Sequence, residues 1–351
     1  MAKPKFSRIQ ARCDAQIAQR GQIRRFDKET SGVIKTAVIG LGIMGRRMVE
    51  HMDIHPQFDL VSMWDPERVA CDLSAKLAPQ AAVAESAQGA IDAADLVYLA
   101  CPPKPRKTYA LMAAAAGKAV FLEKPLGVDV AESRALVDRL KRSGVPTAVN
   151  FTQAAGDAMA HVSRDARAGV LGDLAGADIV VTYAAWPRQW QVGADWLRFR
   201  AEGGMTREVI SHFLFFSERI LGPLHIVWSR ADYPKGQELC ETHVAARLET
   251  EAGLPVTIMG SVGGAQPDRQ ELTIKGTSKS RRISEFHRDA ASDGGLFIPV
   301  GQEPEDPRAS SLKAQLDDLV LLCEGKPNRL ATTEEALRVQ ILVESILNDQ
   351  T

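Results

Sequence analysis

The chain has 351 residues, of which 45% are hydrophobic and 25% charged, and its formal net charge is −1 at pH 7. This length allows two domains with sizeable cores, and the near-zero charge argues against a nucleic-acid or membrane partner. No apolar run approaches the roughly 18 residues that a membrane span needs. Five cysteines, far apart and without a CxxC pair, indicate neither a disulfide framework nor a zinc site and suit a reducing compartment.

The first 32 residues carry eight Lys or Arg against three Asp or Glu, and they contain no hydrophobic segment. We therefore expect residues 1–32 to form a basic N-terminal arm. Within it, Arg24–Lys28 (RRFDK) resembles a twin-arginine export signal. The apolar stretch that follows reads better as the first core strand, because its removal would destroy the glycine-rich site behind it. We expect a cytoplasmic protein.

The next stretch, VIKTAVIGLGIMG, predicts a strand, a tight turn and a helix, with glycines at GxGxxG spacing. The first glycine permits the turn, the second lets the backbone approach a diphosphate, and the third lets the helix pack close to the strand. The anion would lie at the helix N-terminus, where free N–H groups favour negative charge. A glycine turn in some other α/β domain is the alternative. The predicted diphosphate contacts are Gly40, Gly42, Ile43, Met44 and Gly45.

A second predicted strand, Phe58–Trp64, ends in Asp65, where an acid meets the adenosine ribose hydroxyls of a dinucleotide. This carboxylate would bind the ribose of NAD and repel the 2′-phosphate of NADP. Arg68, three residues later, would partly offset that repulsion. We therefore predict NAD as the cofactor, with NADP as the alternative.

Strands and helical segments alternate as far as Phe151, which predicts parallel βαβ units and a doubly wound Rossmann sheet. The ligand of such a sheet lies across the carboxyl ends of the strands. Strand-end segments after each strand should therefore converge with the glycine loop. The cofactor contacts predicted at these ends are Asp65, Arg68, Cys101, Pro102, Pro103, Arg106, Glu123 and Lys124.

Beyond Phe151 several strands follow one another without helices, which predicts an α+β domain with an open, mostly antiparallel or mixed sheet. Two helices close the chain, and Thr332 and Glu335 have the spacing of a capping box at the start of the second. We expect three parts: the basic arm 1–32, an NAD(P)-binding Rossmann domain 33–152, and a substrate and oligomerisation domain 153–351. The final helices should pack back on the Rossmann domain.

Several motifs together resemble the glucose-fructose oxidoreductase, inositol dehydrogenase and MocA (Gfo/Idh/MocA) family. They are GLGIMG, CPP after a strand, VFLEKPLG, the GG-x4-E-x3-H stretch Gly203–His212, ELTIKGT and the final LRVQILVESI. The resemblance covers about residues 33–349, and EKP at Glu123–Pro125 is its most specific piece. It implies an NAD(P)-dependent oxidoreductase acting on sugars, sugar acids, cyclitols or related alcohols. It also implies a homodimer or homotetramer formed through the second-domain sheet.

Hydride transfer between an alcohol carbon and nicotinamide needs a group that exchanges the hydroxyl proton and a polar clamp for the substrate. Lys124 would hydrogen-bond the reacting oxygen, and His212 would exchange its proton. Glu208, one helical turn before His212, would orient the imidazole. These three are the predicted catalytic residues. The alternatives are a surface lysine in a loop and a satisfied polar pair in a core.

Tryptophans and arginines are interleaved between the first strand expected in the second domain and the helix that carries His212. They include Trp190 and the arginines Arg188, Arg198 and Arg207. Aromatic faces can stack on sugar rings, and arginines can clamp a carboxylate, sulfonate or phosphate. An interface or a domain-closing loop is the alternative. The predicted substrate contacts are Lys124, Asn150, Trp186, Trp196, Arg200 and His212.

Three positions depart from the family pattern: Glu208 replaces the usual Asp, Phe215 replaces a second Asp, and Arg106 replaces a histidine after the Pro pair. These departures weaken the assignment of a simple polyol as the substrate. Three other functions stay open: a glycoside hydrolase that uses NAD for transient oxidation and elimination, a non-catalytic nucleotide-sensing regulator, and an imine or tetrapyrrole reductase. The expected partner is a carbohydrate-like small molecule. We expect the protein to bind no metal, no nucleic acid and no membrane.

Overall fold

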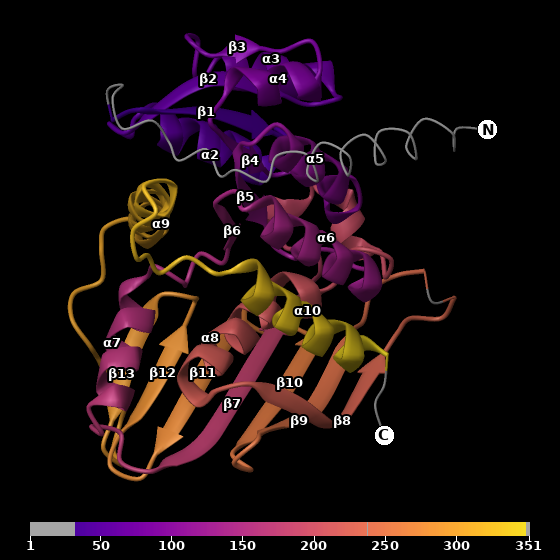
Figure 1. Cartoon of the computed structure of the whole chain (residues 1–351). Helices are drawn as coiled ribbons and strands as arrows, with labels where there is room; N and C mark the ends of the chain where they lie inside the picture. Colours follow the sequence, from indigo (N-terminus) through magenta and orange to yellow (C-terminus); the bar gives the residue numbers. More distant parts are fainter. Residues whose placement is uncertain (1–31, 237, 349–351) are drawn as a thin grey trace. The chain divides into compact units, whose positions relative to one another are not determined.

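The computed structural model describes residues 32–236 and 238–348, so residues 1–31 of the expected basic arm, with Arg24–Lys28, lie outside it. The described chain divides into two compact units (Figure 1). Unit 1 comprises the residues up to Asn150 and Leu312–Leu337. Unit 2 comprises Phe151–Ser311 and the residues from Arg338 onward. The chain therefore passes from one unit to the other three times.

Unit 1 contains a six-stranded parallel sheet with the strand order β3-β2-β1-β4-β5-β6. The order runs outward from β1 in both directions, which is the doubly wound arrangement that the alternation of strands and helices predicts. The predicted Rossmann fold class is therefore confirmed. The strands are β1 Ile34–Ile39, β2 Phe58–Trp64, β3 Ala82–Val83, β4 Leu96–Leu99, β5 Ala119–Glu123 and β6 Thr147–Asn150.

Two of the helices between these strands, α5 and α6, begin or end at residues with the expected capping chemistry. The Asp129 carboxylate accepts the Glu132 N–H at 2.7 Å and caps α6, and Gly144, with φ of 69°, ends it. In α5 the first helical residue is Pro103, where no N–H is needed. The helices are α2 Ile43–Asp53, α3 Arg68–Ala75, α4 Ala87–Ala93, α5 Pro103–Ala115 and α6 Val130–Ser143.

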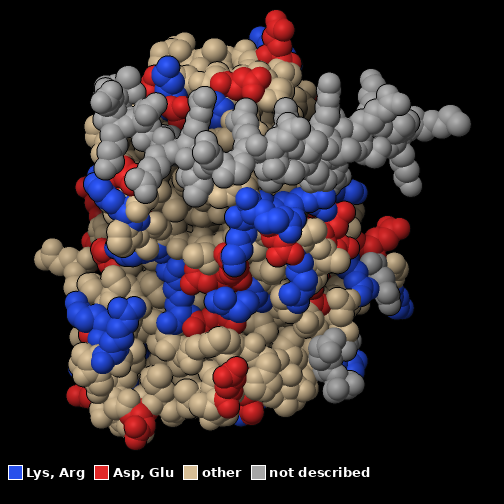
Figure 2. Space-filling model, viewed as in Figure 1, with Lys and Arg blue, Asp and Glu red and all other residues tan. Residues whose placement is uncertain are grey.

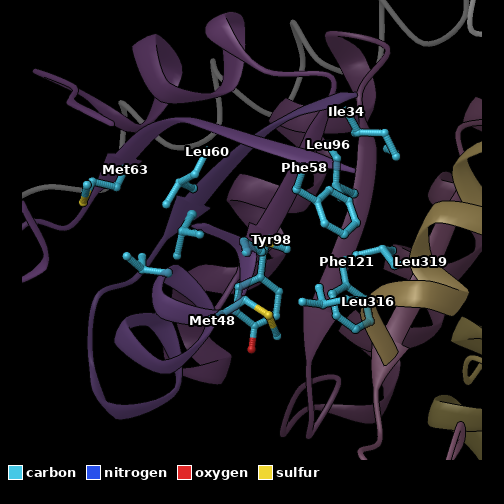
Figure 3. Packing of buried hydrophobic residues seen from close by; sticks show 14 of the residues in the cluster. Ile34, Met48, Phe58, Leu60, Met63, Leu96, Tyr98, Phe121, Leu316 and Leu319 are labelled. Atoms are coloured by element: carbon cyan, nitrogen blue, oxygen red, sulfur yellow. The ribbon is translucent and has the colours of Figure 1, made fainter. Parts of the chain in front are cut away.

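The core of unit 1 draws on a distant part of the chain. Helix α9 (Pro307–Cys323) contributes Leu316 and Leu319, which lie beside Phe121 of β5 (Figure 3). The rings of Tyr98 and Phe121 lie 5.4 Å apart between centroids in the same cluster. The sheet is thus covered in part by residues that follow unit 2 in the sequence.

Unit 2 contains an eight-stranded sheet with the order β14-β13-β12-β11-β7-β10-β9-β8. Only the β7–β10 pair is parallel, so the predicted mixed and mostly antiparallel sheet is confirmed. The strands are β7 Leu174–Tyr183, β8 Leu224–Asp232, β9 His243–Thr250, β10 Pro255–Val262, β11 Arg269–Gly276, β12 Ser280–Ser284, β13 Arg288–Ser292 and β14 Ile298–Pro299.

Helix α8 packs on β7 and β11 of this sheet and against α7. The last helix, α10, starts with the predicted capping box, since Thr332 N–H donates to Glu335 Oε2 at 2.8 Å and Glu335 N–H donates to Thr332 Oγ1 at 3.1 Å. The helices are α7 Asp157–Arg167, α8 Ser211–Leu221 and α10 Thr333–Leu347, with 3-10 turns η1 Gln189–Gln191 and η2 Asp195–Arg198 and a π-helical turn η3 Thr206–Ile210.

Positive and negative side chains are interspersed on the face in Figure 2, outside the atoms drawn in grey. This mixture agrees with the near-zero net charge of the whole chain. No helix within residues 32–236 and 238–348 has the length and apolarity to cross a membrane. The same residues contain no group of three or more His, Cys, Asp or Glu that could hold a metal ion.

Candidate active site

The glycine loop of unit 1 has the geometry that its spacing predicts. Gly40 has φ of +90°, and a Cβ there would lie 2.4 Å from the Cys101 nitrogen, so the loop touches the end of β4. A Cβ on Gly45 would lie 1.8 Å from the Gly40 oxygen. A Cβ on Gly42, in contrast, would meet no described atom within 4 Å. Packing therefore explains the first and third glycines, and the exposed backbone at Gly42 fits the approach of a diphosphate.

The N-terminus of α2 has no side-chain cap, and its cap residue is Gly42. The first N–H groups of the helix, at Ile43 and Met44, are therefore available to an anion. The Asp65 carboxylate lies at the adjacent strand end, where it accepts the Leu41 N–H at 2.6 Å and the Glu67 N–H at 2.8 Å. Exposed Arg68 pairs with Asp72 at 3.0 Å. The acid is thus fixed to the glycine loop, as a ribose-binding group requires.

A buried polar group, which we call the strand-end cluster, comprises Tyr98, Arg106, Glu123 and Asn150. The Glu123 carboxylate accepts the Tyr98 hydroxyl, Asn150 Nδ2 at 2.7 Å and the Lys124 N–H at 3.2 Å. Burial raises the pKa of both Glu123 and Tyr98 above their ordinary values. These bonds join the ends of β4, β5 and β6.

Arg106 ties two of the predicted cofactor loops together. It is 2% exposed, and its guanidinium donates to the Cys101 carbonyl at 2.6 Å and to the Pro125 carbonyl. The side chain is therefore engaged by the protein where a histidine would be expected from the family pattern. Lys124 is half-buried and lies between Glu123 and Pro125, so both of its neighbours are fixed by the strand-end cluster. Asn150 Oδ1 is buried without a hydrogen-bond partner among the described residues.

In unit 2, two glycines set the start of the helix that carries Glu208 and His212. A Cβ on Gly203 would lie 2.2 Å from the Leu197 oxygen. Gly204 has φ of +105°, and a Cβ there would lie 2.3 Å from the Glu241 carboxylate. That buried carboxylate accepts the Thr206 N–H at 2.7 Å. Packing therefore explains both glycines, Gly203 against the Leu197 backbone and Gly204 against the Glu241 carboxylate.

The helix then opens with the π-helical turn Thr206–Ile210, which contains Glu208, before α8 begins. Such turns occur often at functional sites. His212, 7% exposed, lies edge-on to Phe151 and Phe286 at 5.6 and 5.3 Å between ring centroids. Phe286 is held in the left-handed region, with φ of 70°, and its carbonyl accepts Gln153 Nε2 at 3.0 Å. The imidazole is thus oriented by aromatic rings.

The loop after β7 holds a second polar group, which we call the arginine cage: Arg188 with the rings of Tyr183, Trp186 and Trp190. Trp186 anchors this loop, because its Nε1–H donates to the Leu197 carbonyl at 3.0 Å. Gln191 joins the cage to the helix, since it accepts from Arg188 Nε at 2.9 Å and donates to Glu208 Oε1 at 3.4 Å. Trp186 and Glu208, two predicted site residues, therefore lie in one polar assembly.

The other arginines of this loop have different partners. Arg198 forms an exposed ion pair with Asp195 at 3.1 Å, and Arg200 lies 3.8 Å from the Tyr233 ring centroid. Buried Arg207 makes a two-pronged pair with Glu344 at 2.7 Å. Trp196 is half-buried in the 3-10 turn Asp195–Arg198. The substrate roles of Trp196 and Arg200 stay predictions.

Phe215, which replaces the second Asp of the family pattern, makes apolar contacts. Its ring stacks on Phe151 at 4.5 Å between centroids, and the Arg219 guanidinium lies 4.5 Å from the Phe215 centroid. The ring is 1% exposed. This position is therefore part of the core of unit 2, and it supplies no ionisable group.

The glycine loop, the uncapped α2 helix and the acid at the end of β2 together define a dinucleotide-binding Rossmann domain. A family model, described as an oxidoreductase family with an NAD-binding Rossmann fold (GFO_IDH_MocA), matches residues 34–151. Residues 34–151 therefore match the NAD-binding domain of the Gfo/Idh/MocA family of oxidoreductases.

Individual relatives agree with this family. An uncharacterized oxidoreductase of Streptococcus pneumoniae is 26% identical over 178 residues, which are 49% of this chain and 46% of that protein. The scyllo-inositol 2-dehydrogenase (NAD(+)) of Bacillus subtilis is 30% identical over 145 residues, 40% of this chain and 42% of that protein. The matches thus span less than half of the length of these curated relatives.

A solved structure shows that the similarity in fold extends further along the chain. An oxidoreductase from Agrobacterium radiobacter, solved with NAD+, L-tartaric acid and magnesium, has a TM-score of 0.77 and is 16% identical. The comparison covers 89% of this chain and 94% of that one. Both units of the present chain therefore share a fold with that protein.

The residues of these assemblies that were not among the site residues predicted from sequence include Tyr98, Tyr183, Gln191 and Phe286. Tyr183 is the last residue of β7 and has the alternation of an inward apolar position. Gln191 and Phe286 meet their partners through long-range contacts. An aromatic residue with a hydroxyl at a strand end was the only local signal, and it pointed to Tyr183 alone.

Proposed function

We propose that the chain is an NAD-dependent dehydrogenase or reductase that transfers a hydride between nicotinamide and a secondary alcohol or ketone of a carbohydrate-like substrate. Residues 33–152 would bind the dinucleotide, and residues 153–351 would bind the substrate. The observation that carries the proposal is the position of Lys124. It follows Glu123 at the end of β5, in a sheet whose glycine loop and Asp65 fit a dinucleotide.

The strand-end cluster supports a chemical role for this lysine. Glu123 is buried and holds three donors, so the chain on either side of Lys124 is fixed before any ligand binds. A fixed ammonium can hydrogen-bond a reacting oxygen and stabilise negative charge that develops on it, without reorganisation during the reaction. Bound NAD would supply the hydride acceptor. Gly40, Gly42, Ile43, Met44 and Gly45 would hold its diphosphate, and Asp65 its ribose.

His212 would exchange the hydroxyl proton of the substrate. The edge contacts with Phe151 and Phe286 fix the plane of the imidazole, as proton exchange at a defined atom requires. Glu208 lies one turn earlier on the same run of helix and would orient the ring. Asn150, with a buried Oδ1 that lacks a partner in the described chain, would accept a hydrogen bond from the substrate or from the lysine.

The test is a screen of sugars, sugar acids and cyclitols with NAD and with NADP, read by the absorbance of the reduced nicotinamide. We expect at least one compound to give net reduction of NAD at a rate that rises with enzyme concentration. Product formation without net NADH would indicate instead the hydrolase that oxidises its substrate only transiently. Dinucleotide binding without turnover of any compound would indicate a nucleotide-sensing regulator. Either result would contradict the proposal.

We also propose that the protein is cytoplasmic and forms a homodimer or homotetramer through the sheet of unit 2. Four cysteines of the described chain are buried thiols, which suits a reducing compartment. On the sheet, Met259 of β10 and Trp228 of β8 are 62% and 45% exposed, and exposed apolar side chains of a sheet favour association. Light scattering behind gel filtration gives the mass, and Met259→Glu should shift it toward the monomer.

A further inference from the structure

The guanidinium of Arg188 lies among aromatic rings and has no carboxylate partner in the part of the chain that the structure describes. Its Cζ is 4.7 Å from the Trp190 ring centroid, 5.2 Å from that of Tyr183 and 5.7 Å from that of Trp186. Its one side-chain hydrogen bond joins Nε to Gln191. The Nη groups, which form the outer edge of the planar fork, are therefore not used by an ion pair.

Three other arginines of unit 2 have their charge neutralised by direct contact with a carboxylate. Arg207 pairs with Glu344, Arg198 with Asp195 and Arg281 with Asp289. A half-buried arginine that stacks on aromatic rings and lacks such a carboxylate is costly to desolvate, unless an acceptor reaches it. Arg188 is thus the arginine of the tryptophan loop that is arranged to meet an external anion.

The Tyr183 hydroxyl supplies a second donor at the same place. The residue is 0% exposed, and its oxygen is buried without a hydrogen-bond partner in the described chain. Burial raises the pKa of Tyr183 well above its ordinary value, so the hydroxyl keeps its proton at neutral pH. A buried hydroxyl without an acceptor is destabilising. The Tyr183 hydroxyl and the outer edge of the Arg188 guanidinium therefore offer donors at the same place, and among the described residues only Arg188 Nε has an acceptor, Gln191.

Two carboxylates, Asp268 and Glu208, act electrostatically on this hydroxyl, whereas Arg188 opposes them. The guanidinium of Arg308 also lies 5.4 Å from the Trp190 ring centroid, so the surroundings carry charges of both signs. An anion held here would depend on direct hydrogen bonds from the guanidinium fork and the phenol, which match the two oxygens of a carboxylate. Gln191 links the same arginine to Glu208, so a ligand at this place would lie next to the helix proposed to carry the proton exchange.

We propose that Arg188 and Tyr183 form a subsite for a carboxylate group of the substrate, which makes a sugar acid or a related polyhydroxy acid the substrate class. This inference rests on the proposed oxidoreductase function. It assigns the anion to Arg188 and assigns none to Arg198 or Arg200. The cage rings would pack against the carbon skeleton beside the carboxylate.

The test measures binding and does not depend on turnover. The full chain, saturated with NADH, is titrated calorimetrically with two matched pairs of compounds: D-gluconate against D-glucitol, and D-glucuronate against D-glucose. Each pair differs by a carboxylate in place of a CH2OH group. We expect at least one acid to bind about ten-fold or more tightly than its neutral partner, the scale of a charge-assisted pair.

Two variants assign that preference to residues. Arg188→Gln removes the charge and should abolish the preference for the acid. Tyr183→Phe removes one oxygen and keeps the ring, and it should weaken binding of the acid several-fold while leaving the neutral compound unchanged. Arg198→Gln, in the same loop but exposed and paired with Asp195, is the matched control and should keep the wild-type preference. Circular dichroism and thermal melting verify that each variant is folded.

Equal affinity for acid and neutral compound, no binding of either acid, or an unchanged preference in both Arg188→Gln and Tyr183→Phe would overturn the proposal. Should Arg188→Gln not fold, Tyr183→Phe alone decides. Failure of the subsite is distinguishable from failure of the enzyme function. Net reduction of NAD by a neutral sugar, together with equal affinity for acid and neutral compound, would retain the oxidoreductase function and remove the subsite. Arginine-dependent binding of an acid without turnover of any compound would retain the subsite and remove the oxidoreductase function.

Discussion

The strand-end cluster of unit 1 and the arginine cage of unit 2 both bury polar side chains, but they balance donors and acceptors differently. In the cluster, Glu123 and two backbone carbonyls accept from Tyr98, Asn150 and Arg106. In the cage, Gln191 accepts from Arg188 Nε, whereas the Tyr183 hydroxyl has no acceptor among the described residues. The first arrangement holds a loop in place on its own. The second leaves the Tyr183 hydroxyl without an acceptor in the described chain.

The largest effect is expected from removing Lys124, the residue that the strand-end cluster supports. Lys124→Ala should abolish nearly all turnover and leave the affinity for NAD close to that of the wild type, because the lysine is proposed to act on the reacting oxygen. Initial rates and NAD titration by calorimetry give the two quantities. A variant with a normal rate would take Lys124 out of the mechanism and leave the cluster with a structural role.

On the unit 2 side, His212→Ala should lower the rate by roughly two to four orders of magnitude, the usual contribution of a positioned acid or base. His225→Ala, an exposed histidine on β8, is the control and should keep the wild-type rate. Steady-state kinetics with the substrate found in the screen measures both. Equal rates for the two variants would show that the aromatic contacts of His212 serve packing alone.

A third pair of changes compares a buried arginine–carboxylate pair with an exposed one. Arg207→Met leaves Glu344 buried without its partner and should lower the free energy of unfolding by about 3–5 kcal/mol. Arg198→Met removes an exposed pair and should cost less than about 1 kcal/mol. Urea unfolding followed by circular dichroism measures both. Similar losses in the two variants would contradict the distinction between buried and exposed pairs.

The acid at the end of β2 should govern the choice of dinucleotide. Asp65→Ala removes the carboxylate that would bind the ribose diol and repel a 2′-phosphate, so the preference for NAD over NADP should fall about ten-fold, or 1.4 kcal/mol. Titration of both dinucleotides into wild type and variant measures the ratio. If the wild type binds NADP ten-fold more tightly than NAD, the interpretation of Asp65 is wrong.

The smallest expected effect concerns the buried carboxylate of the cluster. Its folded-state pKa is raised above the ordinary 4.5, so the folded protein keeps this proton where the unfolded chain has lost it. Its contribution to stability is therefore present below pH 4.5 and is lost as the pH rises through the folded pKa. Glu123→Gln should flatten this dependence, by at most about 1.4 kcal/mol per pH unit. Urea unfolding of wild type and variant across that range tests it.

The Rossmann sheet could be predicted from sequence because its signals are local. Each parallel strand is a short apolar run, and the glycine spacing and the strand-end residues lie directly beside it. The positions of Asp65, Cys101 and Glu123 at one edge of the sheet follow from that topology alone. Their roles toward a cofactor and a substrate stay predictions, since no local pattern specifies a bound molecule.

The strands β12 and β13 had no such signal. The inward positions of their chains include Arg281 and Asp289, which pair with each other in the interior, and Arg281 also pairs with Asp165 of α7. Charged residues at inward positions remove the alternation of apolar and polar side chains by which a strand is recognised. The link between the arginine cage and Glu208 also had no local signal, because Gln191 reaches Glu208 only after the loop has folded.

The division of both terminal helices between the units has a consequence for synthesis of the protein. The core of unit 1 includes Leu312, Leu316 and Leu330, which leave the ribosome only after the whole of Phe151–Ser311. A nascent chain that ends near residue 151 would expose the apolar surface that these leucines cover, so the segment up to residue 151 cannot complete the packing of unit 1 by itself. The family's nucleotide-binding segment is therefore not an independently folding piece here, and an excised fragment of it should aggregate.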